Sequence, residues 1–98
     1  MTAPVYLGDD VSAAGYRLAG ALVRTPRAGE EAAALAWALS QAPLVLLSTA
    51  VAAGIGGSAL RRALSALQPL VLIVPDLQGQ VPAPDLAARL RTQLGLDA

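Results

Sequence analysis

Two neighbouring carboxylates, Asp9 and Asp10, are the residues of this chain most able to do chemistry, and they follow a short apolar run that ends at Leu7. The sequence contains no histidine, cysteine or lysine. It therefore excludes disulfides, imidazole bases, cysteine nucleophiles, and thiolate or imidazole metal ligands. No base is present that could activate a serine. We expect no catalytic residue, no cofactor-binding residue and no metal site.

A structural role explains Asp9 and Asp10 better than a catalytic role does. Asp9, Asp10 and Ser12 stand at the predicted start of a helix, where each side chain can accept a hydrogen bond from the free backbone N–H groups of the first turn. The positive end of the helix dipole also favours the two carboxylates. The sequence therefore predicts a capped helix directly after the first strand.

Two functional patterns resemble parts of this sequence but are incomplete. An acidic pair after the first strand is typical of response-regulator receiver domains, which also need an acceptor aspartate after the third strand and a lysine near the end of the fifth. Here the third predicted strand ends in Ser48-Thr49, and lysine is absent. The glycines of residues 54–58 lack the lysine of a P-loop and do not follow the first strand, as dinucleotide-binding glycines do. We expect a helix break at that point.

Alternating strands and helices define the expected fold. Strands are predicted at 4–7, 21–24, 43–48 and 69–74, and helices at 11–20, 32–42, and 49–67 with an interruption at Gly56-Gly57. This order predicts an α/β fold, a small Rossmann-like or receiver-like domain with a four-stranded parallel sheet flanked by helices. The runs at 43–48 and 69–74 are continuously aliphatic, which is typical of strands covered on both faces.

Apolar spacing predicts which helix faces lie against the sheet. The first helix has an apolar stripe, in which small residues allow close approach: Val11, Ala14, Gly15, Leu18, Ala19 and Leu22. Tyr16 would flank this stripe and Arg17 would point away from it, so both are candidate protein contacts, since Tyr and Arg are common in interface hot spots. Leu60, Leu64 and Leu67 would share one face of a later helix, and Trp37 is predicted to lie in the core.

The character of the chain changes after Val74. We predict a globular domain at 1–75, a proline- and glycine-containing linker at 76–84 and a C-terminal helix at 85–98. The helix would have an apolar seam of Leu86, Leu90 and Leu94, with Arg89 and Arg91 beside it for acidic surfaces. A helix this short is marginally stable alone. We therefore expect a detachable element that docks on its own domain or on a partner.

Charge and hydropathy limit the possible partners and location. The formal net charge is zero and the pI is about 6.1, which gives no reason to expect nucleic acid as a partner. Mean hydropathy is +0.55, but prolines, glycines and hydroxyl residues interrupt the most apolar stretch, 43–60. That stretch is too broken for a membrane span, and no secretory signal is visible. We expect a cytoplasmic chain without direct membrane insertion.

The first motif carries a family resemblance. Gly8-Asp9-Asp10-Val11-Ser12, followed by Gly15-Tyr16-Arg17-Leu18-Ala19-Gly20, resembles the opening of the small central-stalk subunit of the V-type and archaeal-type rotary ATPases. Tyr16 and Ser12 replace the usual Phe and Thr. Leu72-Ile73-Val74-Pro75 resembles the end of the family's fourth strand, and residues 89–96 resemble its closing basic helix. Residues 46–52 resemble its third strand and turn, but the usual acidic residues are missing.

The resemblance implies a four-stranded parallel sheet, a mobile C-terminal helix and a non-catalytic function. The chain would be a central-stalk rotor subunit that binds the coiled-coil rotor subunit of the V-type ATPase and couples ATP hydrolysis or synthesis to ion translocation. The catalytic head and the membrane-ring adaptor subunit would be indirect partners, and the location would be peripheral to the membrane. The candidate partner-binding residues are Tyr16, Arg17, Leu86, Arg89, Leu90, Arg91 and Leu94. A stand-alone receiver-like adaptor domain without phosphoacceptor chemistry is the alternative, and a small enzyme is the weakest hypothesis.

Overall fold

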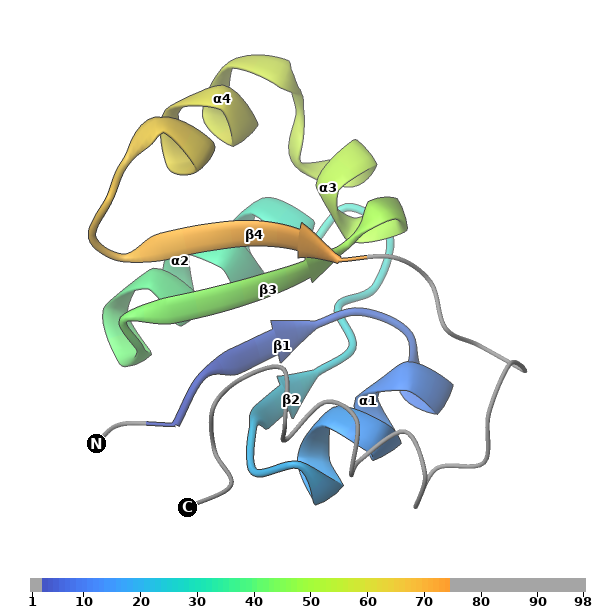
Figure 1. The fold of residues 1–98 in the computed structure, drawn as a ribbon. Helices are drawn as coiled ribbons and strands as arrows, with labels where there is room; N and C mark the ends of the chain where they lie inside the picture. The colour runs from blue at the N-terminus through green and yellow to red at the C-terminus, as the bar shows by residue number, and fades with distance from the viewer. Residues whose placement is uncertain (1–2, 75–98) are drawn as a thin grey trace.

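A computed structural model describes residues 3–74 of the chain, which form one parallel sheet with helices on both faces (Figure 1). The elements are β1 (Val5–Leu7), α1 (Asp10–Leu18), β2 (Leu22–Arg24), α2 (Glu31–Gln41), β3 (Leu44–Ser48), α3 (Thr49–Ile55), α4 (Gly57–Ser65) and β4 (Leu70–Val74). The strand order is β2-β1-β3-β4, and every pairing is parallel. The predicted four-stranded α/β fold is confirmed.

The two faces of the sheet carry separate apolar clusters. Val5 and Leu7 of β1 pack with α2, α3 and α4 on one face, while Tyr6 packs with α1 on the other. Figure 1 shows α1 in front of the sheet and α2 behind it. All the residues of β1, and all of β3 except its first, are buried. The prediction that β3 is covered on both faces is therefore confirmed.

Helix α1 presents a different face to the sheet than the spacing predicts. Gly15 and Ala19 are buried as expected, but Val11 and Leu18 are 47% and 52% exposed. Tyr16 is 2% exposed, and its ring stacks on Tyr6 with the centroids 4.1 Å apart. Burial of this one large side chain decides the rotation of the helix, because residues one position apart differ by about 100° around the axis. The predicted stripe is therefore wrong in part, and so is the flanking position of Tyr16.

The predicted break in the third helical region is confirmed. Gly56 has a φ of +99°, a conformation that favours glycine, and it separates α3 from α4. Helix α4 ends at Ser65, so Leu67 lies outside it and is 82% exposed. The predicted face of Leu60, Leu64 and Leu67 is wrong in part: Leu60 is half-buried and packs against the core cluster, but the buried residue of α4 is Ala63.

Strand β4 lies at the edge of the sheet and is covered much less than β3. Of its residues only Val71 is buried, whereas Leu70, Leu72 and Ile73 are exposed. The prediction that both faces of this strand are covered is wrong for residues 3–74, because α1 packs mainly over β1 and β2 and leaves Leu70 and Leu72 exposed. The linker predicted at 76–84 and the helix predicted at 85–98 lie outside the described residues.

Candidate functional site

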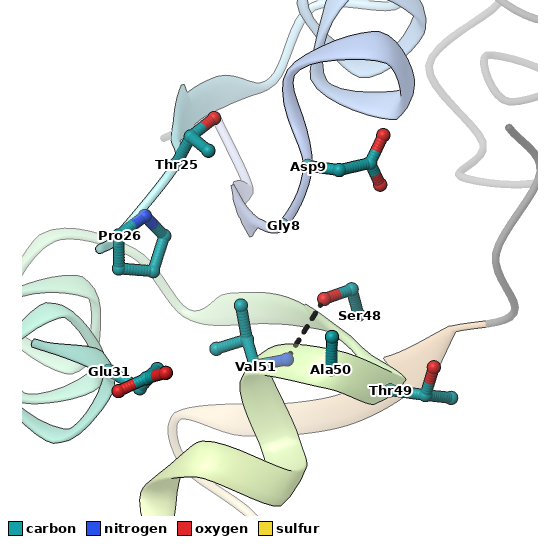
Figure 2. Close-up of a pocket in the computed structure, with 9 residues that line it drawn as sticks. All are labelled: Gly8, Asp9, Thr25, Pro26, Glu31, Ser48, Thr49, Ala50 and Val51. Atoms are coloured by element: carbon teal, nitrogen blue, oxygen red, sulfur yellow. Dashed lines mark hydrogen bonds between the residues drawn. The ribbon is translucent and has the colours of Figure 1, made fainter. Parts of the chain in front are cut away.

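The carboxyl end of the sheet holds a hollow at the point where ligands bind in many open α/β folds. Neighbouring strands β1 and β3 lead there into helices on opposite faces, which is the topological switch point of such a sheet. The hollow has a volume of about 280 Å³. Figure 2 shows the residues that line it: Gly8, Asp9, Thr25, Pro26, Glu31, Ser48, Thr49, Ala50 and Val51.

The polar side chains on the strand ends cap helices. Asp9 Oδ2 accepts a hydrogen bond of 2.8 Å from the backbone N–H of Ser12, which confirms the predicted cap of α1 for Asp9. Ser12 is not a cap, because its buried Oγ accepts no hydrogen bond from a backbone N–H among residues 3–74. Ser48 Oγ accepts a bond of 3.1 Å from the backbone N–H of Val51 and caps α3 (Figure 2). Asp10 lies in the first turn of α1 and is exposed. Asp9 and Ser48 therefore satisfy backbone donors that the helix starts leave open.

The second carboxylate of the hollow, Glu31, contacts the turn before α2 and also helix α3. Its Oε1 accepts a hydrogen bond of 2.8 Å from the backbone N–H of Gly29. The same carboxylate packs so closely on Gly54 that a Cβ at that position would overlap it. Glu31 thus fixes the start of α2 against α3. Among residues 3–74 no group of three or more His, Cys, Asp or Glu side chains could hold a metal ion.

A tyrosine pair underlies the capped turn. The hydroxyl of Tyr6 lies 3.5 Å from Asp9 Oδ1. Burial, and then the negative charge of Asp9, raise the pKa of Tyr6 far above its ordinary value, and burial also raises the pKa of Tyr16. Both rings therefore stay neutral through the physiological range, and they serve as packing groups beneath Gly8.

An apolar candidate binding surface lies on edge strand β4. We define the β4 surface as the exposed side chains of Leu70, Leu72 and Ile73. The register pairs Leu70 with Leu44 and Leu72 with Leu46, and this puts both leucines on the α1 face of the sheet. Ile73 pairs with Leu47 and lies on the opposite face, so exposed apolar side chains stand on both faces of this edge strand. Exposed apolar side chains that lie close together mark surfaces that bind other proteins.

The residues predicted as partner contacts have different outcomes. Tyr16 lies in the core and offers almost no surface to a partner, so its expected contact role is corrected to a packing role. Arg17 is exposed in the last turn of α1, as predicted. The other five, Leu86, Arg89, Leu90, Arg91 and Leu94, lie outside the part of the chain that the structure describes.

The contact between exposed Arg24 and half-buried Trp37 was not predicted. The guanidinium carbon of Arg24 lies 3.7 Å from the ring centroid of Trp37. Trp37 is half-buried and packs on the core cluster, so its predicted core position is correct only in part. The two residues are far apart in the sequence, and only the position of β2 beside α2 brings them together. No spacing in the sequence indicates this contact.

Comparisons with known proteins find no matching protein-family model, no matching curated protein and no matching solved structure. Within residues 3–74, no helix has the length and apolar character needed to cross a membrane.

Proposed function

We propose that this chain is a non-catalytic, protein-binding component of the rotor stalk of a V-type or archaeal-type rotary ATPase, corresponding to the small central-stalk subunit of that family. It would bind the coiled-coil rotor subunit and help to couple ATP hydrolysis or synthesis in the head to ion movement in the membrane ring. Its location would be cytoplasmic and peripheral to the membrane.

The β4 surface is the observation that carries a protein-binding function. All five residues of β4 are aliphatic, and Leu72 and Ile73 are 45% and 42% exposed. Soluble proteins usually protect an edge strand with charges, proline or a bulge. This strand has none of them, which is the expected composition of an edge that a partner covers.

The resemblance to the small central-stalk subunit is supported at the level of the fold. Its first motif contains the residues that build α1 and its attachment: Gly8 beneath the cap, Asp9 as the cap, Gly15 and Tyr16 against the sheet, and Gly20 with a φ of +109° after the helix. The strand arrangement is also the one that the resemblance implies. Partner choice is a separate matter and needs a binding experiment.

Co-expression with the coiled-coil subunit encoded in the same genome tests the proposal. We expect a one-to-one complex at low salt. Leu72→Asp should weaken it at least tenfold, because burying the exposed part of a leucine contributes about 1 kcal/mol and a buried charge opposes association further. Leu64→Asp is the matched control, since Leu64 is 37% exposed on α4, which packs on the opposite face of the sheet.

Two results would contradict the proposal. The wild-type chain could fail to bind the coiled-coil subunit, or its gene could have no rotary-ATPase genes beside it. If instead the complex forms and tolerates Leu72→Asp, the partner uses another surface and the β4 argument is wrong.

A further inference from the structure

A stacked arginine and tryptophan form a second, chemically different surface. Arg24 is the last residue of edge strand β2, and its guanidinium lies over the ring of Trp37 of α2. Trp37 rests on the apolar cluster between α2 and the sheet. The ring is therefore held in place from below, and it fixes the arginine side chain above it.

The guanidinium of Arg24 has no acidic partner in residues 3–74. Within these residues the side chain of Arg24 contacts the ring of Trp37 and forms no ion pair. A guanidinium that lies over a ring face still has its N–H donors free in its own plane, where they can form paired hydrogen bonds to a carboxylate.

A hollow lies beside this pair. It has a volume of about 410 Å³, and its lining includes Ala33, Ala34, Pro26 and Glu30 in addition to the stacked residues. The apolar part suits the methylene groups of a side chain. Glu30 is near, and its Oε1 accepts a hydrogen bond of 3.3 Å from the backbone N–H of Arg27. A nearby negative charge disfavours a doubly charged phosphate more strongly than a singly charged carboxylate.

We infer that the Arg24–Trp37 hollow receives an aspartate or glutamate side chain of a partner protein, held by a paired guanidinium–carboxylate contact. The identity of the partner rests on the proposed function, in which an acidic residue of the coiled-coil rotor subunit occupies the hollow. Because the ring contact already orders the arginine, the pair forms with less loss of side-chain freedom than an unstacked surface arginine would suffer. Trp and Arg are also the residues most enriched in interface hot spots.

Trp37 is the sole tryptophan of the chain, so its fluorescence reports on the hollow directly. The first experiment titrates the isolated full chain with a hexaglutamate peptide at low salt, with an uncharged hexaglutamine peptide as reference. We expect a saturable change of emission with hexaglutamate alone. Arg24→Gln should abolish it and Arg24→Lys should weaken it. Glu30→Gln should strengthen binding because it removes the nearby negative charge. Arg61→Gln is the matched control, since Arg61 is exposed on α4, away from the hollow.

The second experiment measures the affinity of the same variants for the coiled-coil subunit. Arg24→Gln should weaken the complex about tenfold to a hundredfold, and Arg24→Glu should be rescued by an acidic-to-lysine change in the partner. If the complex forms equally well with Arg24→Gln, the inference is wrong while the proposed function stands. If the wild-type chain does not bind the coiled-coil subunit, the proposed function fails, and the peptide titration decides the inference alone. An emission change that is the same in the Arg24→Gln and wild-type chains would overturn it.

Discussion

Gly8→Ala should be one of the most destabilising single-methyl substitutions in this domain. Gly8 is buried at the end of β1, directly above the ring of Tyr6. A Cβ there would overlap the Tyr6 hydroxyl and Cζ, and it would lie 2.8 Å from Cε2. Tyr6 cannot move aside easily, because it is 1% exposed and its ring stacks on Tyr16.

Overpacking of this kind costs about 1–3 kcal/mol. For a domain of this size, each 1 kcal/mol lowers the midpoint of thermal unfolding by about 4–8 °C, so the expected decrease is about 4–24 °C. The Tyr6→Phe background removes the hydroxyl, which is the nearest atom. The destabilisation by Gly8→Ala should therefore shrink in that background without disappearing, since Cζ and Cε2 remain.

Thermal and urea unfolding, followed by circular dichroism and by Trp37 fluorescence, measure both effects. Gly57→Ala is the matched control, because the nearest atom to its added Cβ is Arg61 Nη1 at 3.9 Å. We expect that control to be neutral or slightly stabilising. A Gly8→Ala chain that unfolds within a degree or two of the wild type would refute the argument that Tyr6 is fixed beneath the turn.

Three further predictions follow from the same elements. Asp9→Ala should lower the free energy of unfolding by about 1 kcal/mol through loss of the α1 cap, whereas Asp10→Ala, which removes no cap bond, should change it much less in the same urea titration. Ultraviolet titration of the two tyrosines should show less tyrosinate in the folded chain than in the unfolded chain at pH 10.0, the ordinary pKa. Because the pKa values of both tyrosines are raised in the folded chain, their neutral forms contribute to the free energy of unfolding, and this contribution is fully present below pH 10. It is lost as the pH rises above 10 and the unfolded chain ionises. The midpoint of thermal unfolding should therefore fall with alkaline pH. Truncation after Gln80 should leave the domain folded with unchanged Trp37 emission, because residues 3–74 contain two apolar clusters of their own; unfolding on truncation would mean that later residues belong to the core.

Local chemistry made the order of elements and the cap of α1 predictable. Aliphatic runs separated by glycine and proline mark the strands, and the cap joins residues that are three apart, Asp9 and Ser12. The rotation of α1 was not predictable in this way, since it depends on a contact between Tyr6 of β1 and Tyr16. The two aliphatic runs of β3 and β4 are nearly the same in sequence, yet one is central and the other is at the edge. Composition indicates a strand, but strand order decides its exposure.

The residues that build α1 and the exposed residues of the edge strands differ in what a substitution can test. The motif that resembles the small central-stalk subunit consists largely of groups that build α1, such as the cap Asp9 and the buried Tyr16. Substitutions there would change stability and partner binding together, so they cannot distinguish a fold defect from a lost contact. Arg24 lies outside the segments that carry the resemblance, and Leu72 belongs to the segment that resembles the fourth strand but not to the α1 motif. Both residues are exposed, on opposite edge strands. Loss of partner binding at either position, with the midpoint of thermal unfolding unchanged, would therefore report on function alone.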